Sequence, residues 1–406
     1  MSNRLKATIL SISLALVVFV AAGGLVVRAS SNDGAYRQLG VYSEVLSRIR
    51  SEYVEEPNIP QVTDGALHGL LESLDANSSY LNPQQYKEYK AHKKEGKGDI
   101  GAAISKRYGY AAVIAVVPGG PADKAGLEGS DIIEAIETKS TRDMSLAEVR
   151  DILAGPPGST ISVSVVRARR AEPQKVTLTR EIVNLPPVSD KLLQDGIGYI
   201  KVSVINKGKA QEIANDLKTL QRDGAKKLIL DLRDSADGDE AEGVAIANLF
   251  LNHGVITYLQ GQKYPRETFN ADPQKALTNL PLVVLVNRGT AGAAEVVAGS
   301  VLENARGDVV GDKTFGAGSI QKLIEIPDGS ALILSIAKYY TPSGKAIQDA
   351  AITPNILVAD ANQDAVLPDE DGNALPRDEE KKIEKQQEDE QLNKAIDVLR
   401  SRQAKN

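Results

Sequence analysis

The sequence contains no cysteine and no tryptophan, and aromatic residues make up only 4% of it. Without cysteine, the chain cannot form disulfide bonds, use a thiolate nucleophile or build the thiolate-rich zinc sites. There are three histidines, His68, His92 and His253, and they lie far apart in the sequence. No two of them have the spacing of metal ligands, so we predict neither a metal site nor a cofactor.

The chain also lacks an excess of positive charge, because 48 Lys and Arg are set against 54 Asp and Glu. A protein that binds nucleic acid needs basic residues to neutralise phosphates and aromatic residues on which bases stack. Since both are scarce, no nucleic-acid partner is expected. The length of 406 residues is sufficient for two or three ordinary domains.

One long apolar run is present near the N-terminus, where 21 uncharged residues at 7–27 follow Arg4 and Lys6. This length can cross a bilayer as a helix, and the preceding positive charges favour a cytoplasmic N-terminus. A cleaved signal peptide is the alternative. We therefore expect residues 1–33 to be a membrane anchor or signal with a linker. The rest of the protein is expected on the extracytoplasmic, periplasmic side, anchored in the inner membrane or secreted.

Three further segments differ in their hydrophobic pattern. Apolar residues recur every three or four positions over 34–95, which predicts an N-terminal helical region whose apolar stripes pack on the protein or on a second subunit. Residues 96–183 contain short apolar runs, Gly and Pro turns and one amphipathic helix, as in a small β-rich module. Residues 361–406 form a charge-dense linker that ends in a helix with one apolar stripe. This last helix either docks on its own core or pairs the chain in a homo-oligomer.

Residues 184–360 alternate uniformly apolar strands with helices, a pattern typical of a parallel sheet covered on both faces. Ligands bind such sheets at the carboxyl ends of the strands. Two loops have this position, LDLRDSADG at 230–238 and VNRGTAGAAE at 286–295. The second loop follows the strand LPLVVLV and leads into a helix, as a nucleophile turn does, yet it offers Gly292 and Ala294 where a reactive side chain would be expected.

A series of motifs, in this order, resembles the C-terminal processing peptidases, also called tail-specific serine proteases. The resemblance covers nearly the whole chain after the apolar run. The motifs are LDANSSYLNPQQY at 74–86, PGGPADKAGLEGSDII at 118–133, LILDLR at 228–233, LPLVVLVNRGTAGAAEVVAG at 280–299, GDKTFGAGSIQ at 311–321 and DGSALILSIAKYYTPSGKAIQ at 328–348.

The resemblance implies an α/β protease core with a parallel-rich sheet and flanking helices, preceded by a PDZ domain, with helical segments at both ends. A PDZ domain binds the carboxyl terminus of a peptide by strand addition. Members of this family use a serine nucleophile, a lysine general base and a glutamine that orients the lysine. Backbone N–H groups from a Gly-Gly turn form part of the oxyanion hole.

The catalytic positions of the family are altered in this chain. The serine position falls on Gly292 and the lysine position on Ala317, and both lie inside recognisable motifs with no gap between them. The glutamine position, Gln321, is unchanged. In the oxyanion turn, Asp237 and Gly238 stand where the family has two glycines. A carboxylate there would repel a developing oxyanion by roughly 4 kcal/mol at about 4 Å and an effective dielectric near 20.

The carboxylate-binding loop of the PDZ domain is also altered, because Asp99 lies within Gly98-Asp99-Ile100-Gly101. A carboxylate at this position should weaken the capture of a peptide's terminal carboxylate. The expected lining of the peptide groove is Ile100, Gly101, Ile104, Val149 and Leu153, although these residues could equally serve folding alone.

Other residues could in principle replace the missing dyad. Thr290 and Lys313 lie near the two altered positions, and Ser335 and Lys338 have an S-x-x-K spacing. The S-x-x-K pair lies in a strand-like run, where residues three apart face opposite sides. An acidic cluster between Asp231 and Glu242 lacks the spacing of a calcium loop, so we interpret it as a solvated turn.

The leading hypothesis is a pseudoprotease that binds peptide or protein C-termini, or that pairs with an active homologous peptidase. The alternative is an active serine endopeptidase with a relocated catalytic residue or with an alteration at Gly292. A decaying copy without function is the third hypothesis.

Overall fold

The computed structural model describes residues 33–92, 98–167, 172–359 and 389–403. The chain divides into two compact units, Met1–Leu67 and His68–Asn406. The candidate membrane segment 7–27 lies outside the described residues. Among the residues that are described, no helix is long and apolar enough to cross a membrane.

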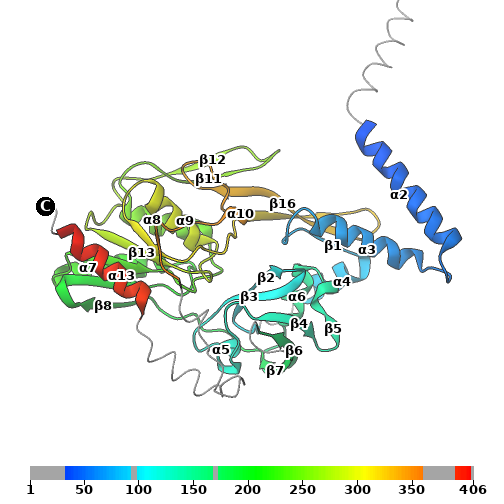
Figure 1. Ribbon diagram of the computed structural model, residues 1–406, viewed down its shortest axis with the longest axis horizontal. Helices are drawn as coiled ribbons and strands as arrows, with labels where there is room; N and C mark the ends of the chain where they lie inside the picture. The colour runs from blue at the N-terminus through cyan, green and yellow to red at the C-terminus, as the bar shows by residue number, and fades with distance from the viewer. Residues whose placement is uncertain (1–32, 93–97, 168–171, 360–388, 404–406) are drawn as a thin grey trace, which may run out of the picture. The chain divides into compact units, whose positions relative to one another are not determined.

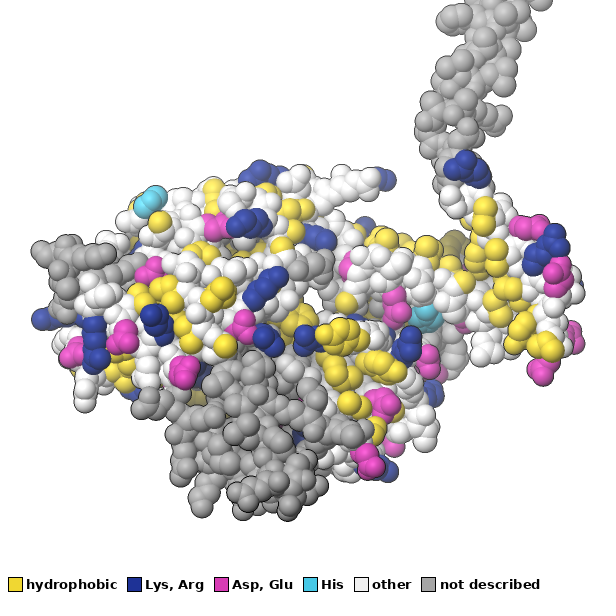
Figure 2. Space-filling view, viewed as in Figure 1, with side chains coloured by type: hydrophobic (Ala, Val, Ile, Leu, Met, Phe, Trp, Pro, Cys, Tyr) yellow, Lys and Arg dark blue, Asp and Glu magenta, His cyan; other side chains and the backbone are white. Residues whose placement is uncertain are grey.

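The first unit consists of α2 (Asp33–Glu52) and the beginning of α3 (Ile59–Glu72). Apolar side chains along α2 are exposed, and they form the yellow patches on this helix in Figure 2. Leu39 is 61% exposed and Val45 is 50% exposed. The expected apolar stripe is therefore present on α2, and its pairing in a homo-oligomer stays a prediction.

The second unit contains a six-stranded sheet in the order β17-β14-β13-β10-β9-β8, of which β13 and β8 are labelled in Figure 1. Within this sheet, β9, β10, β13, β14 and β17 pair parallel with one another. Strand β8 pairs antiparallel with β9 at one edge. The strands are β8 (Ser189–Leu193), β9 (Ile197–Lys201), β10 (Lys227–Asp231), β13 (Leu282–Val286), β14 (Asp308–Gly311) and β17 (Ile356–Leu357).

Helices cover both faces of this sheet. One face packs against α7 (Lys209–Arg222), α8 (Glu240–Phe250) and α9 (Ala293–Glu303). The other face packs against α13 (Glu390–Gln403), coloured red in Figure 1, through Ala395 and Leu399. Every residue of β10 and β13 is buried. Strand β13 is uniformly apolar, and β10 has an apolar centre, 228–230, between Lys227 and Asp231. The predicted α/β core is confirmed, and the stripe of the C-terminal helix packs on the chain's own sheet.

A second, antiparallel sheet joins distant parts of the same unit. Its strands follow the order β1-β16-β11-β12, and β15 also pairs with β16. They are β1 (Ser79–Leu81), β11 (Val255–Gln260), β12 (Glu267–Asn270), β15 (Ser319–Glu325) and β16 (Ala331–Tyr340), with α4 (Pro83–His92) after β1 and α10 (Ile347–Ala350) after β16. Strand β1 lies inside the region predicted to be helical, because residues 79–81 pair with β16 from the far end of the chain.

The β-rich module is a separate sheet with the order β2-β3-β4-β6-β7, and β5 pairs with β4. The strands are β2 (Ala102–Arg107), β3 (Tyr110–Val116), β4 (Ile132–Ile136), β5 (Lys139–Ser140), β6 (Thr160–Val166) and β7 (Gln174–Thr179), with helices α5 (Pro121–Ala125) and α6 (Leu146–Leu153). Ser145 and Glu148 form a reciprocal capping box that begins α6. Strand β2 is at an edge of this sheet, which is where strand addition takes place in a PDZ domain.

Candidate functional site

Three loops meet at the carboxyl edge of the parallel sheet. They follow the adjacent strands β10, β13 and β14, so the sheet order itself brings them together. Backbone hydrogen bonds join them: the N–H of Ala291 donates to Ser235 O at 2.9 Å, and the N–H of Phe315 donates to Thr290 O at 2.9 Å. Gly292 and Ala317, the predicted nucleophile and base positions, therefore lie in one region.

Gly292 occupies a sharp turn between β13 and α9. Its backbone angles are φ 61° and ψ −121°, a conformation that residues other than glycine rarely adopt. A Cβ added at this position would have no other heavy atom within 4 Å. The strained turn and the open space of a nucleophile are thus retained, while the side chain is absent.

Glu295 connects this turn to the loop that carries Ala317. Its side chain is fully buried and accepts the N–H groups of Gly292 at 3.1 Å, Gly316 at 2.8 Å and Ala317 at 2.7 Å. The hydroxyl of Thr314 also donates to it. Burial raises the pKa of Glu295 to about 7, although these hydrogen bonds act in the opposite direction.

The role of Glu295 was not predicted from the sequence. The available local signal was its place as the third residue of a helix, where a glutamate can reach back to the backbone of the first turn. That signal does not indicate that Glu295 also binds the loop after β14.

Gln321, at the predicted position of the orienting glutamine, forms hydrogen bonds to Ser319. Its amide donates to the carbonyl oxygen of Ser319 at 3.1 Å and to the hydroxyl of Ser319 at 2.9 Å. Ala317 is half-buried and contributes only its backbone N–H to the network. The base position therefore supplies no titratable group.

In the predicted oxyanion turn, the side chain of Asp237 accepts the backbone N–H of the next residue. The N–H of Gly238 donates to Oδ1 of Asp237 at 2.9 Å, and Asp237 itself has a positive φ of 69°. The N–H of Gly292 is bonded to Glu295 in the same way. The carboxylate of Asp237 thus occupies the N–H of Gly238 in the predicted oxyanion turn, and the bond from Gly292 to Glu295 caps the start of α9.

These loops form one wall of a cleft of about 580 Å³, and the edge of the β-rich module forms the other. Of the residues predicted to line the peptide groove, Gly101 and Ile104 lie on the cleft. The other three, Ile100, Val149 and Leu153, lie in the hydrophobic core of the module and are at most 2% exposed.

Two side chains of the β-rich module occupy backbone groups beside the cleft. Oδ1 of Asp99 accepts the N–H of Gly101 at 2.6 Å. The guanidinium of Arg150, on α6, donates to the carbonyl oxygen of Ile104 from Nη2 at 2.7 Å and from Nε at 3.2 Å. Burial and the charge of Asp237 raise the pKa of Asp99.

Comparisons with known proteins agree with this architecture. The model of peptidase family S41 matches residues 196–358, and that of the PDZ domain matches residues 113–167. The chain is 30% identical to a carboxy-terminal-processing protease of Bartonella bacilliformis, and the match covers 84% of this chain and 82% of that protein. A carboxyl-terminal-processing protease of Synechocystis sp. is 35% identical over 76% of this chain and 74% of its own length. The chain belongs to the C-terminal processing peptidase family.

The structure of a photosystem II D1 C-terminal processing protease has the same fold. It aligns with a TM-score of 0.65 and 25% sequence identity, covering 82% of this chain and 95% of that chain. The β-rich module is thus a PDZ domain beside a C-terminal processing peptidase core, and the relatives support a serine peptidase ancestry for the cleft.

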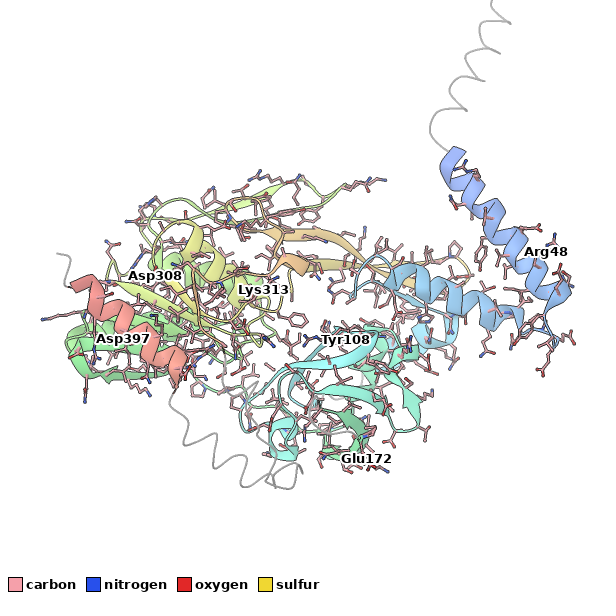
Figure 3. The ribbon with its side chains drawn as sticks, viewed as in Figure 1. Arg48, Tyr108, Glu172, Asp308, Lys313 and Asp397 are labelled. Carbon is pink, nitrogen blue, oxygen red and sulfur yellow. The ribbon has the colours of Figure 1, made fainter. Side chains whose placement is uncertain are left out.

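The structure describes all four residues that were considered as replacements for the family's dyad. Thr290 is fully buried, and its hydroxyl donates to Leu232 O at 2.8 Å. Lys313, labelled in Figure 3, is exposed. Ser335 and Lys338 both lie in β16, where Ser335 donates to Asp75 at 3.1 Å and pairs with Gln321, while Lys338 pairs with Ser319.

The acidic cluster is not uniformly solvated, so that interpretation was wrong for its first member. Asp231 is fully buried and forms an ion pair with Arg233 at 2.6 Å. The hydroxyl of Tyr199 donates to the same carboxylate at 2.7 Å. Arg233 also pairs with Asp389 at 2.8 Å, just before α13, so this buried pair ties the C-terminal helix to the end of β10.

Proposed function

We propose that this chain is a PDZ-containing pseudoprotease, which binds a polypeptide in the cleft and does not hydrolyse it. The observation that carries the proposal is the state of the catalytic turn. Gly292 and Ala317 provide no nucleophile or base, and the side chain of Asp237 accepts the N–H of Gly238, which an oxyanion would need. Covalent catalysis, general base catalysis and oxyanion stabilisation are therefore lost together.

Direct labelling tests this proposal. The purified full chain is incubated with a fluorophosphonate probe and, separately, with an unfolded protein, beside the carboxyl-terminal-processing protease of Synechocystis sp. as the active control. We expect neither labelling nor cleavage by this chain. Cleavage at a reproducible site, together with labelling of one serine or threonine, would establish the alternative of a relocated nucleophile.

The relatives favour peptide carboxyl termini as the ligand class, because they combine a PDZ domain with a peptidase named for carboxyl-terminal processing. An active homologous peptidase is the second candidate partner. The exposed apolar side chains of α2, among them Leu39 and Val45, are the surface that such pairing would use.

We also propose that the cleft lies on the extracytoplasmic side of a membrane. The support is the apolar run at 7–27 and the positive charges that precede it. Alkaline phosphatase fused after residue 33 should then be active in a bacterial host, and the same fusion without residues 7–27 should be inactive. Equal activity of the two fusions would contradict the proposed location.

A further inference from the structure

In both the PDZ groove and the predicted oxyanion turn, an aspartate side chain of this chain accepts a backbone N–H that could otherwise bind an anion. Asp99 accepts the N–H of Gly101, and Asp237 accepts the N–H of Gly238. A free carboxylate at the end of a peptide would have to displace Asp99 before it could bind the loop. The displaced Asp99 would remain close by as a like charge.

The charge of the cleft adds to this effect. Four carboxylates line it, those of Asp99, Asp234, Asp237 and Glu240. Among the described lining residues, Arg150 is the one cation. The pKa values of Asp99 and Glu240 are raised by burial and, in both cases, by the charge of Asp237, so the carboxylates act on one another. Such a cleft disfavours an added anion and favours an added cation.

Arg150 occupies the other backbone group that a bound strand would need. Strand addition requires the edge groups of β2, and the carbonyl oxygen of Ile104 already accepts two N–H groups from Arg150. An incoming peptide N–H can replace this bond. The charge of Asp237 already acts on Arg150, so an anion of the cleft attracts the released guanidinium.

We propose that this groove pairs with an internal segment of a partner polypeptide that carries Lys or Arg, and that it discriminates against a free terminal carboxylate. The inference rests on the proposed function, that a polypeptide binds in the cleft without being hydrolysed, and it replaces the carboxyl termini that the relatives favour with an internal segment as the ligand of this groove. The partner's chain end lies outside the groove, and basic side chains of the segment face Asp99, Asp237 and Glu240.

Fluorescence anisotropy with matched peptides tests this ligand class. The probes are one N-terminally labelled peptide of alternating valine and lysine, made as the free acid, as the amide and with three added residues at its end. A fourth probe has glutamate in place of lysine. With the parent chain, the amide and the extended peptide should bind at least about tenfold more tightly than the free acid, since one displaced charge-assisted hydrogen bond is worth roughly that factor. The glutamate peptide should show no binding.

Two variants of Asp99 separate the effect of the occupied N–H of Gly101 from the effect of the carboxylate charge on peptide binding. Asp99→Gly frees the N–H of Gly101 and should remove the preference for the amide, whereas Asp99→Asn keeps an acceptor there and removes only the charge, so its preference should be intermediate. Asp143→Asn, an exposed aspartate of the PDZ domain that does not line the cleft, is the matched control and should behave as the parent.

Each outcome has a separate meaning. Tightest binding of the free acid to the parent chain overturns the inference and leaves the pseudoprotease proposal unaffected. Absence of binding by all four peptides also overturns the inference. Hydrolysis of any of these peptides overturns the proposed function instead, and it is detected independently by mass spectrometry of the same samples.

Discussion

A chain that carries Gly292→Ser, Ala317→Lys and Asp237→Gly together is expected to hydrolyse an unfolded protein at least about 100-fold faster than the parent. A positioned general base contributes on the order of 100-fold or more to such reactions. The structure retains the frame for it: the turn at Gly292 has the strained conformation and the open space, and Glu295 holds this turn against the loop of residue 317.

Asp237 decides how much of this gain is realised. While its carboxylate accepts the N–H of Gly238, that N–H cannot stabilise an oxyanion. Loss of one oxyanion donor costs roughly 100- to 1000-fold in rate. The double variant that keeps Asp237 should therefore be slower than the triple variant by about this factor. Glycine at 237 also suits the backbone, since Asp237 has a positive φ of 69°.

The matched control is Gly292→Ala combined with the other two changes. Alanine carries the same backbone strain as serine, about 1 to 3 kcal/mol, but no hydroxyl. It should be folded and inactive, and only the serine variant should react with a fluorophosphonate probe. If the serine variant is folded and neither reacts nor cleaves, the former catalytic frame is not intact.

The fold of the core could be predicted from local pattern. Strand β13 and the centre of β10, 228–230, are uniformly apolar because helices cover them on both faces, and the alternation with helices then specifies a parallel sheet. Strand β1 could not be predicted, because its partner β16 lies about 250 residues later and no local period encodes that pairing.

Motif spacing predicts which positions of the site are altered, whereas the hydrogen bonds of the side chains around those positions could not be predicted. Gly292 and Ala317 are recognised because the motifs around them persist. The bond from Arg150 to Ile104 and three of the four hydrogen bonds to Glu295, which come from the loop 314–317, join residues from different elements. Their formation depends on tertiary packing, and a single sequence records residue types without recording which of them meet.

Glu295 is expected to make the stability of the protein decrease as the pH rises from about 4.5 to about 7. Burial raises its pKa in the folded state to about 7, from 4.5 for a glutamate without a protein environment. Over this range the folded protein keeps a proton that the unfolded chain has released, so the stabilisation is complete below pH 4.5 and is lost as the pH passes 7. The corresponding change in unfolding free energy is about 3 kcal/mol.

Urea unfolding at pH 5, 6, 7 and 8 measures this dependence as the difference between the parent and Glu295→Gln. The glutamine cannot titrate. In the parent, Gly316 and Ala317 donate their N–H groups to oxygens of Glu295, whereas in the variant an NH₂ group faces such an N–H. The variant should therefore be less stable by roughly 1 to 3 kcal/mol at pH 5. This deficit should shrink toward pH 8, because only the parent loses stability. Glu267→Gln, the same change at an exposed residue of β12, is the matched control for the loss of one carboxylate. A deficit of Glu295→Gln that grows toward pH 8 would mean that the four hydrogen bonds outweigh burial and hold this carboxylate ionised in the folded protein.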